Sequence, residues 1–133
     1  MKVLSNAHTH TVFCDGNNTP AEMAAAAEAL GFTSLGFSSH SPAPFDPTCP
    51  GVADEKAYRA AVAEVAKQWA GRLEIACGME QDVFAPVKRE DYDYVIGSAH
   101  YMKDAKDNFV AVDSSLEQVL DLRNETFGGD GVA

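Results

Sequence analysis

The sequence predicts an α/β domain in which parallel strands are connected by crossover helices. Short apolar runs of strand length alternate along the chain with longer segments of helical periodicity, and capping residues begin these helical segments. The 133 residues are 46% hydrophobic and 23% charged, and no repeat or linker divides them. This length and composition indicate one globular domain.

The first third of the chain is predicted to form a strand, a helix and a second strand. Residues 2–7 (KVLSNA) are the first strand candidate. Residues 19–31 are expected to be helical because Thr19 suits the N-cap and Glu22 completes a capping box with it. Residues 33–38 (TSLGFS) are predicted to be the second strand.

The middle of the chain continues the same alternation after an irregular segment. Residues 41–51 contain four prolines, so they are expected to be a loop, and their length suits a lid or a binding loop. Residues 54–71 place apolar side chains at helical spacing. The strands predicted next are residues 72–78 and 91–99, and the apolar run of the latter favours burial on both faces.

The last third of the chain is predicted to add one short strand and one helix. Residues 108–113 (NFVAVD) are the fifth strand candidate. Residues 114–128 are expected to be helical, with Ser114 and Glu117 as the capping box.

Every histidine of the chain comes directly after a predicted strand. His8 and His10 follow the first strand, His40 follows the second, and His100 follows the fourth. Glu80 comes after the third strand. Because the carboxyl ends of parallel strands meet at one edge of the sheet, these side chains are expected to converge there.

The residue types at this edge are those that hold transition-metal ions. In an extended segment, His8 and His10 point to the same side, and Asp15 can return an oxygen ligand to them from a short loop. Imidazole together with carboxylate favours zinc, manganese or iron over magnesium or calcium. Glu80 has two oxygens and can bridge two cations, as two-metal hydrolases require.

Each of these residues, taken alone, also has an interpretation without a metal. His40 suits a hydrogen-bonded loop histidine, and His100 suits a core histidine whose hydrogen bonds are satisfied. Asp82 is predicted either to orient Glu80 or to form a surface ion pair. Tyr101 and Lys103 follow His100 and are candidates for substrate contact. The metal interpretation depends on the joint placement of the histidines.

The formal net charge of −10 narrows the class of partners. It argues against nucleic acid and anionic membranes, because phosphate backbones are bound by Lys and Arg. A small phosphorylated substrate remains compatible, since bound cations reverse the local field. The three cysteines form no C-x-x-C pair and the N-terminus has no apolar signal region, so a cytoplasmic location is expected.

Four motifs in order, HTHTVFCDG, LGFSSHSP, GMEQD and DYVIGSAHYM, resemble the PHP (polymerase and histidinol phosphatase) family. VIGSAHY and the later VDSS…FGGD point to its histidinol-phosphate phosphatase branch. The resemblance implies part of a distorted (β/α)7 barrel with up to three divalent ions at the carboxyl ends of the strands. The implied ligands come in three pairs: His8 with His10, the bridging Glu80 with His100, and Asp15 with His40.

The resemblance also implies a reaction and a substrate. Family members hydrolyse phosphate monoesters with a metal-bound hydroxide, and in this branch the substrate is L-histidinol phosphate in histidine biosynthesis. Two alternatives remain: a PHP phosphoesterase with another substrate, such as a nucleic-acid 3′ end, or a metal-binding fragment without turnover.

The chain departs from the family pattern in two residues and in length. Asn6 and Ser39 stand where the family usually has Asp, and those carboxylates would orient imidazoles. A barrel of this kind takes about 250 residues. Residues 1–133 therefore resemble the N-terminal portion of a PHP domain, without the family's later histidine and Asp-x-His ligands. Either these residues are a truncated product, or a second copy or another chain completes the sheet. Because a half-barrel exposes a strand edge and an apolar face, we expect self-association.

Overall fold

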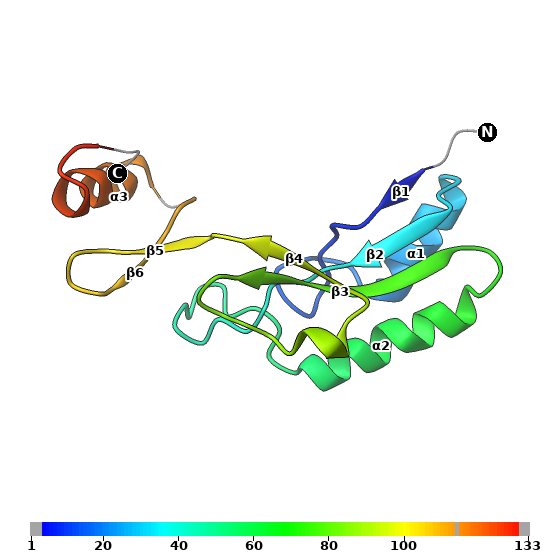
Figure 1. The fold of residues 1–133 in the computed structure, drawn as a ribbon. Helices are drawn as coiled ribbons and strands as arrows, with labels where there is room; N and C mark the ends of the chain where they lie inside the picture. The colour runs from blue at the N-terminus through cyan, green and yellow to red at the C-terminus, as the bar shows by residue number, and fades with distance from the viewer. Residues whose placement is uncertain (1–3, 114, 131–133) are drawn as a thin grey trace.

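The computed structural model describes residues 4–113 and 115–130, and a four-stranded parallel sheet lies at its centre (Figure 1). The strands are hydrogen-bonded in chain order: β1 (Ser5–Asn6), β2 (Ser34–Phe37), β3 (Glu74–Asp82) and β4 (Tyr94–Ser98). This arrangement confirms the predicted α/β class and matches part of a (β/α) barrel.

Two helices pack on one face of the sheet and on each other. They are α1 (Pro20–Ala29) and α2 (Glu55–Gln68). The predicted capping box of α1 is confirmed, since the Thr19 hydroxyl accepts from the Glu22 N–H and the Glu22 carboxylate accepts from the Thr19 N–H. Asp54 caps α2 through one hydrogen bond, in which its carboxylate accepts from the Ala57 N–H.

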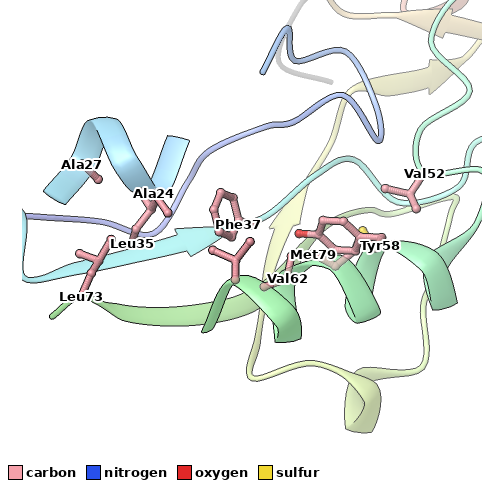
Figure 2. Packing of buried hydrophobic residues seen from close by; sticks show 10 residues of the cluster. Ala24, Ala27, Leu35, Phe37, Val52, Tyr58, Val62, Leu73 and Met79 are labelled. Atoms are coloured by element: carbon pink, nitrogen blue, oxygen red, sulfur yellow. The ribbon is translucent and has the colours of Figure 1, made fainter. Parts of the chain in front are cut away.

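The hydrophobic core lies between these helices and the sheet (Figure 2). Phe37 from β2 and Met79 from β3 are fully buried against Tyr58 and Val62 of α2. Each such side chain contributes about 1.5–3 kcal/mol by its burial. The core therefore fixes the strands whose carboxyl ends carry the candidate ligands.

The Tyr94 ring packs closely against glycines of β2 and β3. A Cβ on Gly36 would lie 2.3 Å from the Tyr94 hydroxyl, and one on Gly78 would lie 2.3 Å from the Tyr94 ring. Glycine at both positions lets the ring lie close against the strands. The Tyr94 hydroxyl donates to the carbonyl of Ala7, so it also fixes the segment that leads into His8.

Two of the predicted strands differ from the observed ones. The third strand was expected to end at residue 78, but β3 continues to Asp82, so Glu80 lies inside it. Its pairing with β4, in which Asp82 lies opposite Ser98, explains the extension. The expected burial of residues 91–99 on both faces is wrong: most of β4 is half-buried and Gly97 is exposed. Of the first predicted strand, residues 5 and 6 form β1, and residues 2 and 3 lie outside the described residues.

The last third of the chain was predicted to continue the alternation of strand and helix, but its strands do not join the parallel sheet. The strand expected at residues 108–113 is β6 (Phe109–Ala111), which pairs antiparallel with β5 (Tyr101–Lys103) in a separate hairpin. The hairpin extends away from the sheet toward α3 (Leu116–Asp121) (Figure 1).

The helix expected at 114–128 begins later than predicted. Ser115 caps α3 by accepting from the Gln118 N–H, and Ser114 lies outside the described residues. The helix ends in a π-helical turn, Leu122–Thr126. A 3₁₀ turn, Arg89–Asp91, precedes β4. Within residues 4–113 and 115–130, the helices are too short or too polar to form a membrane span.

Candidate metal centre

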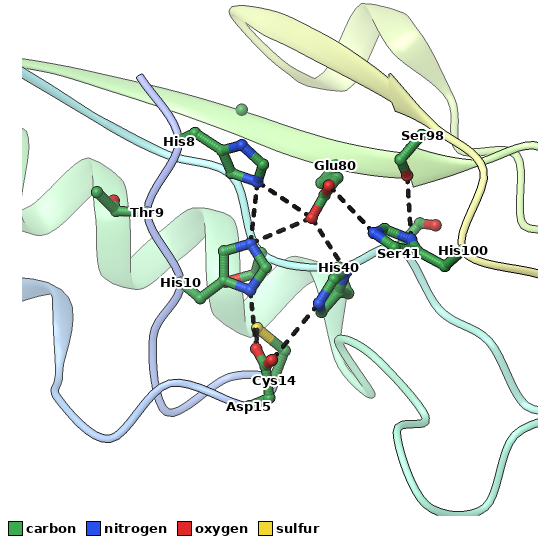
Figure 3. A network of polar contacts seen from close by, with 12 residues as sticks. His8, Thr9, His10, Cys14, Asp15, His40, Ser41, Glu80, Ser98 and His100 are labelled. Carbon is green, nitrogen blue, oxygen red and sulfur yellow. Dashed lines mark hydrogen bonds and ion pairs between the residues drawn. The ribbon is translucent and has the colours of Figure 1, made fainter. Parts of the chain in front are cut away.

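The four histidines and two carboxylates singled out in the sequence lie together at the carboxyl ends of the parallel strands (Figure 3). His8 and His10 follow β1, and His40 follows β2. Glu80 projects from β3, and His100 lies between β4 and β5. The sheet therefore brings side chains 92 residues apart in sequence to one site, as the strand order predicted.

Backbone pairing beyond β2 positions His40 beside Glu80. The two residues form an isolated parallel bridge, in which the Glu80 N–H donates to Ser39 and the Ser41 N–H donates to Glu80. The buried Tyr58 hydroxyl fixes the β3 backbone near Glu80, because it donates to the Gly78 carbonyl at 2.9 Å. Burial raises the Tyr58 pKa, so the hydroxyl keeps its proton. No pattern in the sequence had indicated a role for this tyrosine.

Glu80 is the centre of the cluster. Its Oε2 lies 3.2 Å from His8 Nε2, 3.1 Å from His10 Nε2 and 3.1 Å from His40 Nδ1. Its Oε1 lies 3.3 Å from His100 Nε2. Ligand atoms on one tetrahedral zinc ion, at about 2.0–2.1 Å from it, lie about 3.4 Å apart. The spacing therefore matches donors that share a divalent cation.

The buried Glu80 carboxylate lacks the hydrogen bonds that burial normally demands. Its side chain is 6% exposed, yet Oε2 has no hydrogen-bond partner among the described residues. An ionised carboxylate in this position is costly unless a cation compensates it. The donor set and this orphaned oxygen together fit a metal ion.

Asp15 forms the second pole of the cluster. Its Oδ1 lies 2.8 Å from His10 Nδ1, and its Oδ2 lies 3.5 Å from His40 Nε2. The neighbouring Cys14 donates its thiol proton to Asp15 Oδ1 at 3.1 Å. The candidate ligands form three groups, and within each group the ligand atoms lie within 4.8 Å of one another. The groups are His8, His10 and Glu80; His10, Asp15 and His40; and His40, Glu80 and His100.

The protein environment raises the pKa of one of these groups and lowers the pKa of two others. A hydrogen bond with Cys14, assisted by Asp15, raises the His10 pKa to about 9 despite partial burial. Burial opposes ionisation of Asp15, but hydrogen bonds with His10 and Cys14 lower its pKa to about 2. Burial and the neighbouring His10 lower the His40 pKa. Asp15 as a carboxylate and His40 as a neutral imidazole are in the protonation states that metal ligands require, whereas His10 must release its proton to bind an ion.

Asn6 and Ser39, which stand where the family usually has Asp, each make a polar contact near the site. Asn6 Oδ1 accepts from the His8 N–H at 2.9 Å, so this side chain still fixes the start of the His8 segment. Ser39 is fully buried, and its hydroxyl pairs with that of Thr11 at 3.3 Å.

Asp82 is buried beside His100 and forms no surface ion pair among the described residues. It is 3% exposed, and its carboxylate accepts from the N–H groups of Phe84 and His100, at 2.8 and 2.7 Å. The prediction of a surface ion pair is therefore wrong, because the extension of β3 to Asp82 buries this side chain beside His100.

A cavity of about 280 Å³ begins beside His40 and His100. Loop residues 41–51 line one side of it, as expected for a binding loop, and Asp113 lies at another. Tyr101 lines the cavity and donates to Asp46 at 2.7 Å. Lys103 does not line it and instead pairs with Asp107 at 2.8 Å. Of the two residues proposed for substrate contact, the structure places only Tyr101 at the cavity.

Comparison with known proteins identifies the family of this chain and some of its relatives. Residues 6–128 match the PHP domain family. A Deinococcus radiodurans protein named as a probable histidinol-phosphatase is 34% identical over 114 residues, which cover 77% of this chain and 44% of the relative. The chain thus spans less than half the length of this curated relative.

Two solved structures share the fold. One is the crystal structure of the protein hisK from Listeria monocytogenes (TM-score 0.73, 22% identity, 86% of this chain and 51% of that one). The other is histidinol phosphate phosphatase from Lactococcus lactis, in complex with zinc, L-histidinol and phosphate (TM-score 0.63, 20% identity, 76% of this chain and 43% of that one).

Proposed function

The chain belongs to the PHP domain family, and we propose that it supplies the metal-binding half of a phosphomonoester hydrolase of the histidinol-phosphatase type. The observation that carries the proposal is the Glu80 carboxylate, which is buried among four imidazoles and has no hydrogen-bond partner for Oε2. The names of the relatives support the same class of substrate.

The candidate ligands divide the work of holding divalent ions. We propose that His8, His10 and Glu80 hold one ion, and that Glu80 and His100, with His40, hold a second. Asp15 would join His10 or His40 at a third. Zinc, manganese or iron bound there would lower the pKa of a water molecule and neutralise phosphate oxygens.

The chain's own residues contribute orientation and charge. Glu80 supplies the negative charge that balances the cations, and the rigid β2–β3 pairing fixes the separation of its oxygens from His40. Tyr94 and Asn6 hold the backbone on either side of the Ala7–His8 bond, so the first imidazole is positioned before any ion binds. This preorganisation reduces the cost of assembling the site.

The adjoining cavity supports a positively charged alcohol as the leaving group. The cavity adjoins His40 and His100, so it can receive the alcohol part of a phosphate ester bound at the cluster. Asp46 and Asp113 line the space, and no Lys or Arg is among its described lining residues. L-Histidinol, the ligand in the Lactococcus complex, carries an amine and an imidazole that suit this charge.

Location and assembly are part of the same proposal. All three cysteines are free thiols, which supports a reducing compartment such as the cytoplasm. β1 and β4 each lack a further strand partner among the described residues, which supports completion of the sheet by another β/α unit. We propose a second copy of this chain, and light scattering after size exclusion, with and without zinc, tests it.

Phosphate release with metal-loaded protein tests the function. We expect zinc or manganese to support hydrolysis of L-histidinol phosphate, EDTA to abolish it, and His8→Ala to abolish it as well. Glu74→Gln, on the exposed start of β3, is the matched control and should remain active. Stoichiometric metal without phosphate release in any oligomeric state would contradict the proposal and favour the non-catalytic fragment.

A further inference from the structure

His100 differs from two other histidines of the cluster in what its second ring nitrogen contacts. For His10 and His40, both nitrogens face candidate ligand carboxylates. For His100, Nε2 faces Glu80, whereas Nδ1 contacts Ser98 and Asp82, which are not candidate ligands. The contacts of Nδ1 therefore decide which nitrogen of His100 carries the proton.

Ser98 is placed to accept a hydrogen bond from His100. A serine hydroxyl has one proton to donate and two lone pairs. Ser98 Oγ lies 3.1 Å from the Gln81 carbonyl oxygen, which has no proton, so the hydroxyl proton points there. Ser98 Oγ also lies 3.1 Å from His100 Nδ1, and while its proton is donated to Gln81 it accepts from this nitrogen.

Asp82 gives Nδ1 a second neighbour that only accepts. Its Oδ2 lies 3.6 Å from Nδ1 and accepts from the His100 N–H at 2.7 Å, which anchors the residue by its backbone. Asp82 and Ser98 lie opposite each other in the β3–β4 pairing, so the sheet itself delivers both acceptors to this nitrogen.

We propose that Ser98, supported by Asp82, is a positioning residue that keeps the proton of neutral His100 on Nδ1 and so reserves Nε2 for a divalent cation. The inference rests on the proposed metal site. Nε2 then presents a lone pair toward Glu80 Oε1 at 3.3 Å, and a divalent cation bound by both atoms would relieve the repulsion between these two acceptors. A hydrogen bond on the remote nitrogen is how proteins orient imidazole ligands.

Nitrogen-15 NMR of the zinc-loaded wild-type chain tests the tautomer directly. Long-range couplings from the His100 ring protons distinguish the two nitrogens, and we expect a protonated Nδ1 with zinc on Nε2. Zinc on Nδ1, or a proton on Nε2 in the loaded protein, would overturn the inference while leaving the proposed function in place. No binding of zinc at all would overturn both.

Variants of Ser98 test its effect on the metal. Ser98→Ala leaves Nδ1 with Asp82 beyond hydrogen-bond length, and we expect about 10-fold weaker zinc binding in competition with a chromophoric chelator. Ser98→Thr keeps the hydroxyl and should restore the affinity, and Ser34→Ala in β2 should leave it unchanged. Equal affinity of Ser98→Ala and Ser34→Ala would refute the positioning role. If Ser98→Ala does not fold, the wild-type tautomer decides.

Discussion

Replacing Glu80 with glutamine tests whether this carboxylate is the shared ligand of the cluster. Glu80→Gln keeps the size of the side chain but removes its negative charge and one of its two anionic oxygens. Glu80 belongs to two of the three groups of candidate ligands, so the change affects most of the site at once. Because the side chain is buried, solvent does not replace the lost oxygen.

The expected magnitude follows from linkage between metal binding and folding. Zinc at 100 times its dissociation constant stabilises the wild-type chain by about 2.7 kcal/mol. For a chain of this length, 1 kcal/mol raises the melting temperature by about 3–5 °C, so the expected rise is about 8–14 °C. If loss of Glu80 weakens binding about 100-fold, the same zinc concentration stabilises the variant by about 0.4 kcal/mol. Its melting temperature then rises by about 1–2 °C.

Thermal unfolding with EDTA and with zinc provides the assay. Each protein is its own reference, so a change in the stability of the metal-free variant does not enter the comparison. Glu74→Gln, an exposed substitution in the same strand, should keep the full wild-type shift. An equal zinc shift in Glu80→Gln and in the wild type would refute the role of Glu80 as shared ligand.

Two further predictions concern the scaffold and the loop beside the cavity. Gly78→Ala should lower the free energy of unfolding by about 1–3 kcal/mol in urea titration, because its Cβ would clash with Tyr94. Gly97→Ala, which meets no atom within 4 Å, should change it by less than about 0.5 kcal/mol, and equal effects would contradict the close approach. Hydrogen bonds led by Thr48 lower the Asp46 pKa to about 2, so its stabilisation is full above about pH 4 and is lost as pH falls through 2. Urea titrations between pH 2 and 5 should thus show a shallower acid loss for Asp46→Asn, and parallel curves would contradict this.

The strand order and the convergence of the ligand candidates could be predicted from sequence because both follow from local patterns. The capping box at Thr19 is confirmed, and strands of residues 33–38 and 91–99 were placed within a few residues of their ends. The parallel alternation then located His40 and Glu80 on the same edge without any distance information.

The elements that sequence reasoning missed depend on pairing partners. β5 is a three-residue strand that gains its hydrogen bonds from β6, and nothing in its own residues distinguishes it from a loop. The extension of β3 likewise depends on β4, and it decides that Asp82 is buried.

Local sequence patterns also could not predict which residues position the candidate ligands. Tyr58 and Tyr94 come from a helix and a strand that carry no ligand, and they reach the site across the core and across the sheet. Ser98 had one available signal: it stands two residues before His100, a spacing that places extended side chains on one side.

Zinc-edge anomalous diffraction from crystals of the zinc-loaded chain tests the central claim most directly. The account predicts anomalous density between Glu80 and the imidazoles, at about 2.0–2.2 Å from their ligand atoms. Saturating zinc with no anomalous density among His8, His10, Glu80 and His100 would contradict it.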